Sequence, residues 1–229
     1  MPRIKMFGAI PRKKDVTSEW FHDHYRHPHG TLGRHISTMR NYTQCHQVHS
    51  DLLGADQTRF EACAEVWFDN VEDAVNFPQE PVYVRDVVPD EPLFVDMDEL
   101  RFCFAEEEIL KTGPDIREPM SPGDMVWRLD NRPNSFKLLQ FIEEEGTERW
   151  DGADDYELGE RIGVLRHVRC RPSPVLHPDG AFVVGIRELY WPTKTDMEAG
   201  VARDPAAWRA LIERPGKATA YLGTAERFI

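Results

Sequence analysis

A pattern of strands and helices that occurs twice in the chain is the feature that most constrains how it folds. The segment AEVWFDNVEDAV (64–75) aligns with RELYWPTKTDMEA (187–199), so that Glu65 stands opposite Glu188 and Trp67 opposite Tyr190. In the first half, strand-like runs occupy 3–10, 38–49, 60–69 and 100–110. Helical patterns lie between them, one starting at Thr17 or Ser18 and one at 70–77 with Asn70 as its cap. The first half therefore predicts the order βαββαβ.

The second half contains the same kinds of element. We expect strands at 125–131, 161–171, 181–191 and 217–229, a helix at 134–150 capped by Asn134, and helical pieces within 193–213. Three prolines and two glycines fall between residues 111 and 124, which is typical of a linker. The sequence thus predicts an N-terminal unit at 1–112, a linker at 113–124 and a C-terminal unit at 125–229.

Each βαββαβ unit forms a four-stranded antiparallel sheet with two helices on one face, and its other face is apolar and bare. Two such units in one chain can cover these faces by packing sheet to sheet. The fold class expected is α+β, with two ferredoxin-like units forming an intramolecular version of a dimeric α/β barrel.

Charge and composition limit the partners of the chain. A formal net charge of -12 disfavours nucleic acid and anionic membranes. No stretch approaches the ~18 apolar residues of a membrane span, and no signal segment is recognisable, so we expect a cytoplasmic protein. The four cysteines are scattered singly and read as small buried residues. Association of two fused chains into a homodimer stays open.

The segment EWFHDHYRHPHGTLGRHI (19–36) contains five histidines, and helical phase separates them. Phe21, Tyr25, His29, Leu32 and Ile36 fall on one apolar stripe, which predicts that His29 faces inward. Pro28 removes a helical hydrogen bond just before His29, so we expect a kink that opens a pocket. His29 could exchange protons with a ligand, and a core imidazole satisfied by a neighbour is the alternative.

The same phase argues against a metal site. His22 and His24, like His27 and His29, are two residues apart and splay on a helix, whereas metal ligands must converge. The pair His24 and His27 has suitable spacing, but no carboxylate close in sequence completes it. We therefore expect no metal.

The strands add candidates for the pocket. Tyr42, Gln44 and His46 share one face of their strand, and Glu65 shares a face with Trp67. A glutamate in the apolar run ACAEVWF needs a partner, which could be a ligand, the imidazole of His29, or a salt bridge to Arg40 or Arg85. The small residues at 62–64 leave room for an apolar ligand.

These segments resemble the EthD-like family of the dimeric α/β-barrel superfamily. FHDHYRHPHGTL resembles the family's Phe-x-x-x-aromatic-Arg-x-x-His-[Ala/Gly]-x-Leu motif, with matches at Phe21, Tyr25, Arg26, His29, Gly30 and Leu32. RNYTQCH (40–46) is similar to its Arg-x-Tyr-x-Gln-x-His strand, and AEVWFDNVEDAV to its Ala-Glu-Leu-Trp-Phe-Asp-Ser segment. The resemblance covers roughly residues 3–110 and implies one working pocket in the N-terminal unit, because the second unit departs from these motifs.

The leading functional hypothesis is proton-transfer chemistry without a cofactor on a small aromatic or apolar molecule. Decarboxylation, dehydration or ring closure would each fit such a lyase or isomerase. His29 is the predicted acid/base, Tyr25 the hydrogen-bond donor and Glu65 the orienting carboxylate; Phe21, Tyr42, Gln44, His46 and Trp67 are predicted to contact the substrate.

Three other functions stay open. A cofactor-free monooxygenase would use the same pocket, and a non-catalytic protein would only bind a ligand there. A haem protein similar to chlorite dismutases would need a ligand histidine in the second unit, where only His167 and His177 are present.

Overall fold

The computed structural model describes residues 4–112 and 134–229. In the first unit the strands are β1 (Ile4–Ile10), β2 (Asn41–Gln47), β3 (Ala62–Phe68) and β4 (Arg101–Thr112). The helical segments are α1 (Ser18–His24), η1 (Tyr25–His29), α2 (Gly30–Gly33), η2 (Ala55–Thr58), α3 (Val71–Asn76), η3 (Phe77–Gln79), η4 (Tyr83–Val87) and η5 (Glu91–Leu93). The expected order βαββαβ is confirmed for this unit, including the cap of α3, where the side chain of Asn70 accepts from the amide of Asp73.

The second unit contains strands β5 (Asn134–Glu144), β6 (Arg166–Pro172), β7 (Gly185–Trp191) and β8 (Lys217–Arg227). Its helices are α5 (Asp155–Arg161), α6 (Lys194–Arg203) and α7 (Pro205–Glu213). The predicted linker at 113–124 and strand at 125–131 lie outside the described residues, so the division into units stays a prediction.

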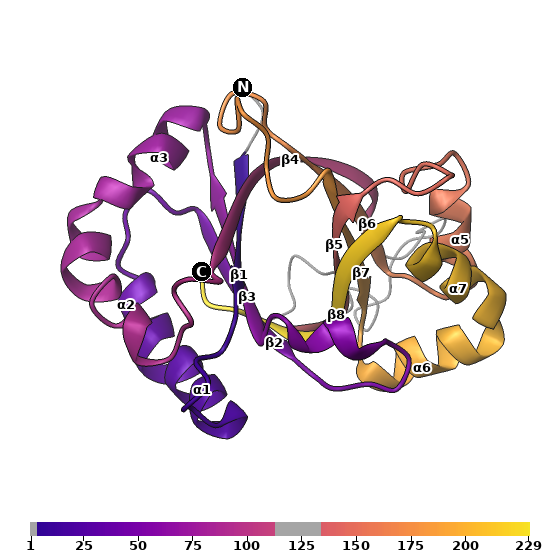
Figure 1. The fold of residues 1–229 in the computed structure, drawn as a ribbon, viewed down its shortest axis with the longest axis horizontal. Coiled ribbons are helices and arrows are strands. Elements are labelled where there is room, and N and C mark those ends of the chain that lie inside the picture. Colours follow the sequence, from indigo (N-terminus) through magenta and orange to yellow (C-terminus); the bar gives the residue numbers. More distant parts are fainter. Residues whose placement is uncertain (1–3, 113–133) are drawn as a thin grey trace, which may run out of the picture.

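The eight strands form one closed barrel in the order β1-β3-β2-β8-β5-β7-β6-β4. Each unit contributes the same four-strand arrangement, β4-β1-β3-β2 and β8-β5-β7-β6. The units join where β2 pairs with β8 and β4 pairs with β6, both antiparallel. Helices α1 to α3 lie on one side of the barrel and α5 to α7 on the other (Figure 1). Closure leaves none of these eight described strands at a sheet edge, and the predicted fused α/β barrel is confirmed.

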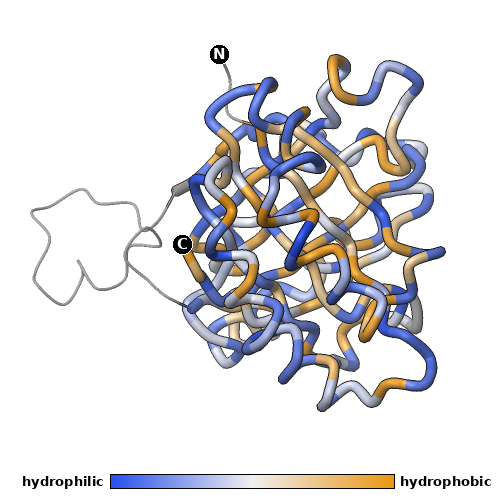
Figure 2. Tube along the Cα trace, turned by 90° about the vertical axis from the view of Figure 1, so that its left-hand side faces the viewer, coloured by the Kyte–Doolittle hydropathy of each residue, from blue (hydrophilic) through white to orange (hydrophobic). Residues whose placement is uncertain are grey.

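Alternation along the strands divides the side chains between the barrel interior and the outer, helix-covered faces. Hydrophobic and hydrophilic residues are interspersed along the segments that run through the middle of the molecule (Figure 2). Phe7, Cys63, Cys103, Phe141 and Tyr221 belong to the buried cluster inside the barrel. Met6, Tyr42 and Val66 point the other way and pack against the helices of the first unit. A ligand between sheet and helices therefore meets a different set of side chains from those inside the barrel.

The helix predicted at 134–150 is wrong, because residues 134–144 form β5 at the centre of the second unit's sheet. Phe136 and Leu138 pack under the helices while Leu139 and Phe141 face the barrel interior, so both faces of the strand are buried. Burial on both faces produces a continuous apolar run whose period does not separate strand from helix. Among the described residues of this unit, the first helix is α5, which begins at Asp155.

Candidate functional site

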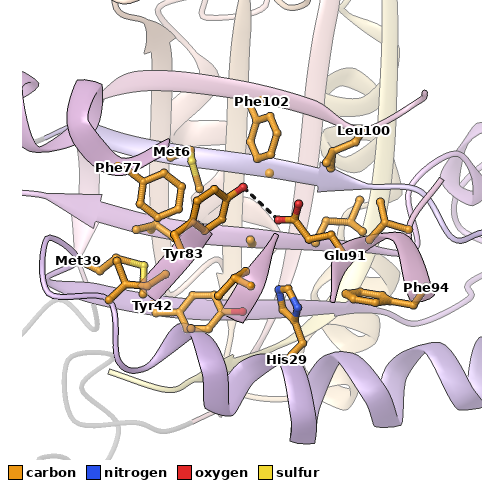
Figure 3. Close-up of a pocket in the computed structure, with 18 residues that line it drawn as sticks. Met6, His29, Met39, Tyr42, Phe77, Tyr83, Glu91, Phe94, Leu100 and Phe102 are labelled. Atoms are coloured by element: carbon orange, nitrogen blue, oxygen red, sulfur yellow. Dashed lines mark hydrogen bonds between the residues drawn. The ribbon is translucent and has the colours of Figure 1, made fainter. Parts of the chain in front are cut away.

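An apolar cavity lies between the outer face of the first unit's sheet and the helical segments that cover it (Figure 3). Its walls come from β1 to β4, from the segment around His29 and from residues 77–100. The lining residues are Met6, Gly8, Ile10, His29, Gly33, Ile36, Met39, Tyr42, Ala64, Val66, Phe77, Tyr83, Val87, Glu91, Phe94, Val95, Leu100 and Phe102. His29, Glu91, Tyr42 and Tyr83 are the polar groups on an otherwise apolar and aromatic surface, which is typical of a small-molecule site.

A π-helical turn brings His29 to this cavity. Helix α1 begins after Thr17, whose side chain accepts from the amide of Trp20, and it continues into the turn Tyr25–His29 with Pro28 inside. Pro28 has no amide hydrogen to donate, and the wider π-helical turn accommodates the missing hydrogen bond. The structure therefore has a π-helical turn at the position where a kink was predicted. His29 is 7% exposed, and its ring packs against Phe94 at 5.0 Å and Tyr25 at 5.5 Å between centroids. The inward orientation of His29 is confirmed.

Asp90 holds the imidazole of His29. His29 Nδ1 lies 2.9 Å from Asp90 Oδ2, and His24 Nε2 lies 2.9 Å from Asp90 Oδ1. Burial would raise the pKa of Asp90, but hydrogen bonds from His29 and His24 outweigh it and lower the pKa below its ordinary value. The ionised carboxylate accepts a hydrogen from Nδ1, so Nε2 of His29 keeps its lone pair and is the nitrogen able to take a proton.

Glu91, the next residue, is a second titratable group on the cavity wall. Burial raises the pKa of Glu91 to about 7, and the negative charge of Asp90 also raises it, against the opposing effect of the Tyr83 hydroxyl. That hydroxyl donates to Glu91 Oε1 at 3.1 Å, the bond drawn across the cavity in Figure 3. A carboxyl with a pKa of about 7 is present in both protonation states near neutral pH, which suits acid/base work.

The raised pKa of Glu91 predicts how the free energy of unfolding depends on pH. A carboxyl with a higher pKa in the folded state than its ordinary 4.5 contributes stability that is fully present below pH 4.5 and lost as pH rises through about 7. We expect Glu91→Gln to gain stability relative to wild type across this window, measured by urea denaturation at several pH values. Glu99→Gln, on an exposed side chain, should show no such trend. A pH-independent difference for Glu91→Gln would contradict the prediction.

The other predicted residues on the histidine helix lie behind the cavity wall. Phe21 and Tyr25 are fully buried and pack against Phe94, at 5.3 and 5.9 Å between centroids. Neither lines the cavity, so they support its wall, and the predicted donor role of Tyr25 does not fit its position. Tyr42, which was predicted to contact substrate, does line it.

The remaining strand residues divide between two faces of the sheet. Gln44 and His46 lie on the helix side with Tyr42, as expected, but behind the cavity wall, where Gln44 Nε2 donates to the carbonyl of Tyr25 at 2.7 Å. Glu65 and Trp67 face the barrel interior, on the opposite side of the sheet from His29. Glu65 pairs with Lys5 at 2.7 Å and Lys137 at 2.6 Å.

The predicted roles of Glu65 and Trp67 at the cavity are therefore wrong. Glu65 cannot orient His29 across the sheet, and its salt-bridge partners are lysines, while Arg40 pairs with Asp69 and Arg85 with Asp86. The indole of Trp67 donates to Glu107 inside the barrel.

Asp90, Glu91 and Tyr83 were missed by the sequence analysis. They lie in a segment of short helical turns whose irregular pattern gave no face to assign, and Asp90 is 61 residues from His29. The signal that could have found Asp90 and Glu91 is the run VPDEPLF, in which two acidic residues stand among apolar ones and prolines. An acidic pair in such a setting is a candidate for burial next to a histidine.

Gly30 follows His29 at a crowded point. A Cβ there would lie 2.5 Å from the ring of Phe228 and 2.9 Å from Gln44 Nε2. We expect Gly30→Ala to destabilise the fold by about 1 to 3 kcal/mol, although alanine is the better helix former. Gly54→Ala is the control, because a Cβ at Gly54 meets nothing within 4 Å. Chemical denaturation of both variants checks this, and equal stability would contradict it.

The corresponding space in the second unit is filled. Trp191, Met197 and Trp208 form a buried cluster there with residues of β5 and α5. His167 is 1% exposed with Nε2 3.0 Å from Asp155 Oδ2, and His177 Nε2 accepts the backbone amide of Phe104 at 2.8 Å. In the part of this unit that the structure describes, neither histidine faces a space that would fit a haem.

A grouping of possible metal ligands lies inside the barrel. Among the described residues, Glu107, Cys170 and Glu188 place ligand atoms close together. Lys5 Nζ lies 2.6 Å from Glu188 Oε1, and Lys137 contacts the other oxygen of Glu188. Because these lysines already neutralise Glu188, the grouping belongs to an ionic network.

Comparison with known proteins supports the resemblance of the first unit. Residues 13–98 match the EthD domain. No curated protein matches the chain. An ethyl tert-butyl ether D (EthD) family protein from Bacillus halodurans is 20% identical, covering 46% of this chain and 99% of its own, with a TM-score of 0.39.

Several solved structures resemble the whole chain, and two of them are described next. An anthrone oxidase-like protein has a TM-score of 0.59 at 13% identity, covering 99% of this chain and 92% of its own. A chlorite dismutase variant from Candidatus Nitrospira defluvii has a TM-score of 0.50 at 9% identity, with coverage of 99% and 92%. At these identities the likeness shows the fold, a two-unit α/β barrel.

None of the helices in the described residues has the length and apolar composition needed to cross a membrane.

Proposed function

We propose, for this EthD domain set in a fused dimeric α/β barrel, that the chain is an enzyme that removes a proton from a small apolar, ring-containing molecule. The observation that carries the proposal is the imidazole of His29, held by Asp90 at 2.9 Å on the wall of an apolar cavity. A carboxylate on Nδ1 orients the ring and stabilises the imidazolium that forms when Nε2 takes a proton.

The substrate class follows from the walls of the cavity. Phe77, Phe94 and Phe102 offer aromatic surfaces, Met6 and Met39 offer polarisable ones, and the polar groups are few. Such a lining favours a flat apolar molecule that carries an oxygen able to accept negative charge after deprotonation. While His29 keeps the proton that it has removed, the protonated carboxyl of Glu91 would donate its own proton at a second position of the substrate, which supports a lyase or isomerase reaction such as dehydration or ring closure.

Oxygenation of the same deprotonated substrate is the second candidate, and the likeness to an anthrone oxidase-like protein over the whole chain favours it. His29 would remove a proton from the acidic carbon of an anthrone, and the resulting anion would reduce dioxygen. The peroxide formed on that carbon loses water to give the quinone. Anthrone and dioxygen thus yield anthraquinone and water, a balance that needs no external reductant.

Parallel incubations under air and under nitrogen test the proposal and separate the two candidates. Anthrone and a panel of phenolic ring ketones would be followed by oxygen uptake and by mass spectrometry. Oxygen uptake with quinone formation identifies the oxygenase, and product formation under nitrogen identifies the lyase or isomerase. Binding without any product under either gas would contradict the proposed enzyme and indicate a ligand-binding protein.

A further inference from the structure

We propose that the hydroxyl of Tyr42 donates a hydrogen bond to a phenolate or enolate oxygen of the ligand, and that Gln44, His46 and His22 fix it in this donor orientation. The inference rests on the proposed function and names the chemical group that the cavity recognises. Tyr42 touches the ligand, while the other three act through it as positioning residues.

The position of Tyr42 suits a donor. It lines the cavity from β2, and its hydroxyl end points toward the side on which His29 lies (Figure 3). Gln44 Nε2 donates to the Tyr42 oxygen at 2.8 Å, which leaves the hydrogen of that hydroxyl to point elsewhere. The neighbouring hydroxyl of Tyr25 acts on Tyr42 as a hydrogen-bond donor that lowers its pKa, so it does not take up this hydrogen. Burial raises the pKa of Tyr42 to about 12, which keeps the hydroxyl protonated at neutral pH.

The amide of Gln44 has only one allowed orientation. Its Nε2 lies 2.7 Å from the backbone carbonyl of Tyr25, and a carbonyl can only accept a hydrogen bond. A flipped amide would place two oxygens against each other there. Nε2 therefore stays between Tyr25 and Tyr42, and Oε1 must accept from His46 Nε2 at 3.2 Å.

The two histidines continue the chain. Burial, followed by the nearby charges of Arg26 and His22, lowers the pKa of His46 to about 2. His46 is therefore neutral, with its hydrogen on Nε2 and its lone pair on Nδ1, which accepts from His22 Nδ1 at 3.0 Å. Glu226 pairs with Arg26 at 2.7 Å and stays 3.9 Å from His46 Nε2, so it does not compete with Gln44.

An acidic anchor completes the chain. His22 Nε2 lies 3.3 Å from Glu61 Oε1, within ion-pair distance of that carboxylate. Burial would raise the pKa of Glu61, but hydrogen bonds from His22, Ser18 and Arg12 lower it to about 2. Each group from His22 to Tyr42 then has one allowed hydrogen direction, and the last of these leaves Tyr42 as a donor to the cavity.

Two measurements test the proposal without knowledge of the natural substrate. Nitrogen NMR of the histidine rings at pH 7 should find His46 neutral with its hydrogen on Nε2, and His22 with a hydrogen on Nδ1. Naphthol serves as the ligand probe, with naphthalene as the matched hydrocarbon, and the absorbance of bound naphthol reports its ionisation. In Tyr42→Phe, the pKa of bound naphthol should rise by about 1 unit, the size expected for a lost hydrogen bond to a charged oxygen.

Control variants separate the two roles. Gln44→Leu should shift the pKa of bound naphthol in the same direction as Tyr42→Phe, while binding of naphthalene stays unchanged in both. If Tyr42→Phe leaves the pKa of naphthol unchanged, or if naphthol does not bind, the donor role is overturned. A hydrogen on Nδ1 of His46 overturns the positioning chain.

The proposed function can fail independently of this inference. The Tyr42→Phe shift should also appear in a His29→Gln background, because it does not depend on proton transfer by His29. If Tyr42→Phe shifts the pKa of bound naphthol in both backgrounds but no variant turns over substrate, the donor role is supported and the proposed enzymatic function is contradicted.

Discussion

Lys137→Met is expected to lower the free energy of unfolding by about 3 to 5 kcal/mol, the cost typical of breaking a buried ion pair. Lys137 lies inside the barrel, fully buried, with its ammonium 2.6 Å from Glu65 Oε1 and in contact with Glu188. It also donates to the hydroxyl of Tyr190 at 2.8 Å. Removing it leaves two buried carboxylates facing the single ammonium of Lys5.

The four charges form a closed arrangement between the two units. Lys5 contacts Glu65 Oε2 at 2.7 Å and Glu188 Oε1 at 2.6 Å, so each lysine bridges both glutamates. Lys5 and Glu65 come from the first unit, and Lys137 and Glu188 come from the second. Since a buried network adds little net stability over an apolar core, we infer that it fixes how the two units fit together.

Two controls sharpen the Lys137 prediction. Lys194→Met removes a lysine whose pair with Glu198 is half-exposed at 3.7 Å, and it should cost less than about 1 kcal/mol. The double variant Lys137→Met/Glu188→Gln restores charge balance and should recover part of the loss. Urea denaturation measures all three variants. If Lys137→Met and Lys194→Met have the same free energy of unfolding, Lys137 does not stabilise the fold by neutralising the buried carboxylates.

His29→Gln is expected to lower kcat by a factor of about 10² to 10⁴, the range typical of a lost general base. The substrate for this measurement is the member of the anthrone and phenolic panel that the wild-type protein turns over. Glutamine keeps a polar side chain of similar length but cannot take a proton. Asp90→Asn should also lower kcat, because an amide can no longer stabilise the imidazolium through Nδ1. Thermal denaturation should show that both variants stay folded.

The matched control for His29 is His27→Gln, on an exposed histidine two residues away in the same turn. It changes the same chemical group without touching the cavity, so its kcat should equal that of wild type. Equal kcat values for His29→Gln and His27→Gln would show that His29 is not the general base.

Much of the architecture could be predicted from the sequence because local patterns repeat. The alternation in residues 62–68 and the cap at Asn70 are local, and the match of Glu65 to Glu188 correctly aligned β3 with β7. Helical phase correctly placed His29 inward, because the apolar stripe of its helix is short and continuous. In β5, by contrast, burial on both faces hid the period of the strand.

The site was harder to predict because its geometry depends on contacts between distant residues. Strand alternation shows that Glu65 and its neighbours Ala64 and Val66 face opposite ways, but it does not say which face meets the helices. Asp90 reaches His29 only through the fold. The carboxylate assigned to His29 was therefore the wrong one, while the inward position of the imidazole was correctly predicted.

The most direct test of the account is proton removal itself, measured separately from any later step. Anthrone labelled with deuterium at its acidic carbon would be incubated under nitrogen, and loss of the label to water would be followed by NMR. The account predicts that wild type accelerates this loss over buffer, and that His29→Gln returns it to the buffer rate while His27→Gln does not. Equal rates of label loss for wild type and His29→Gln would contradict it.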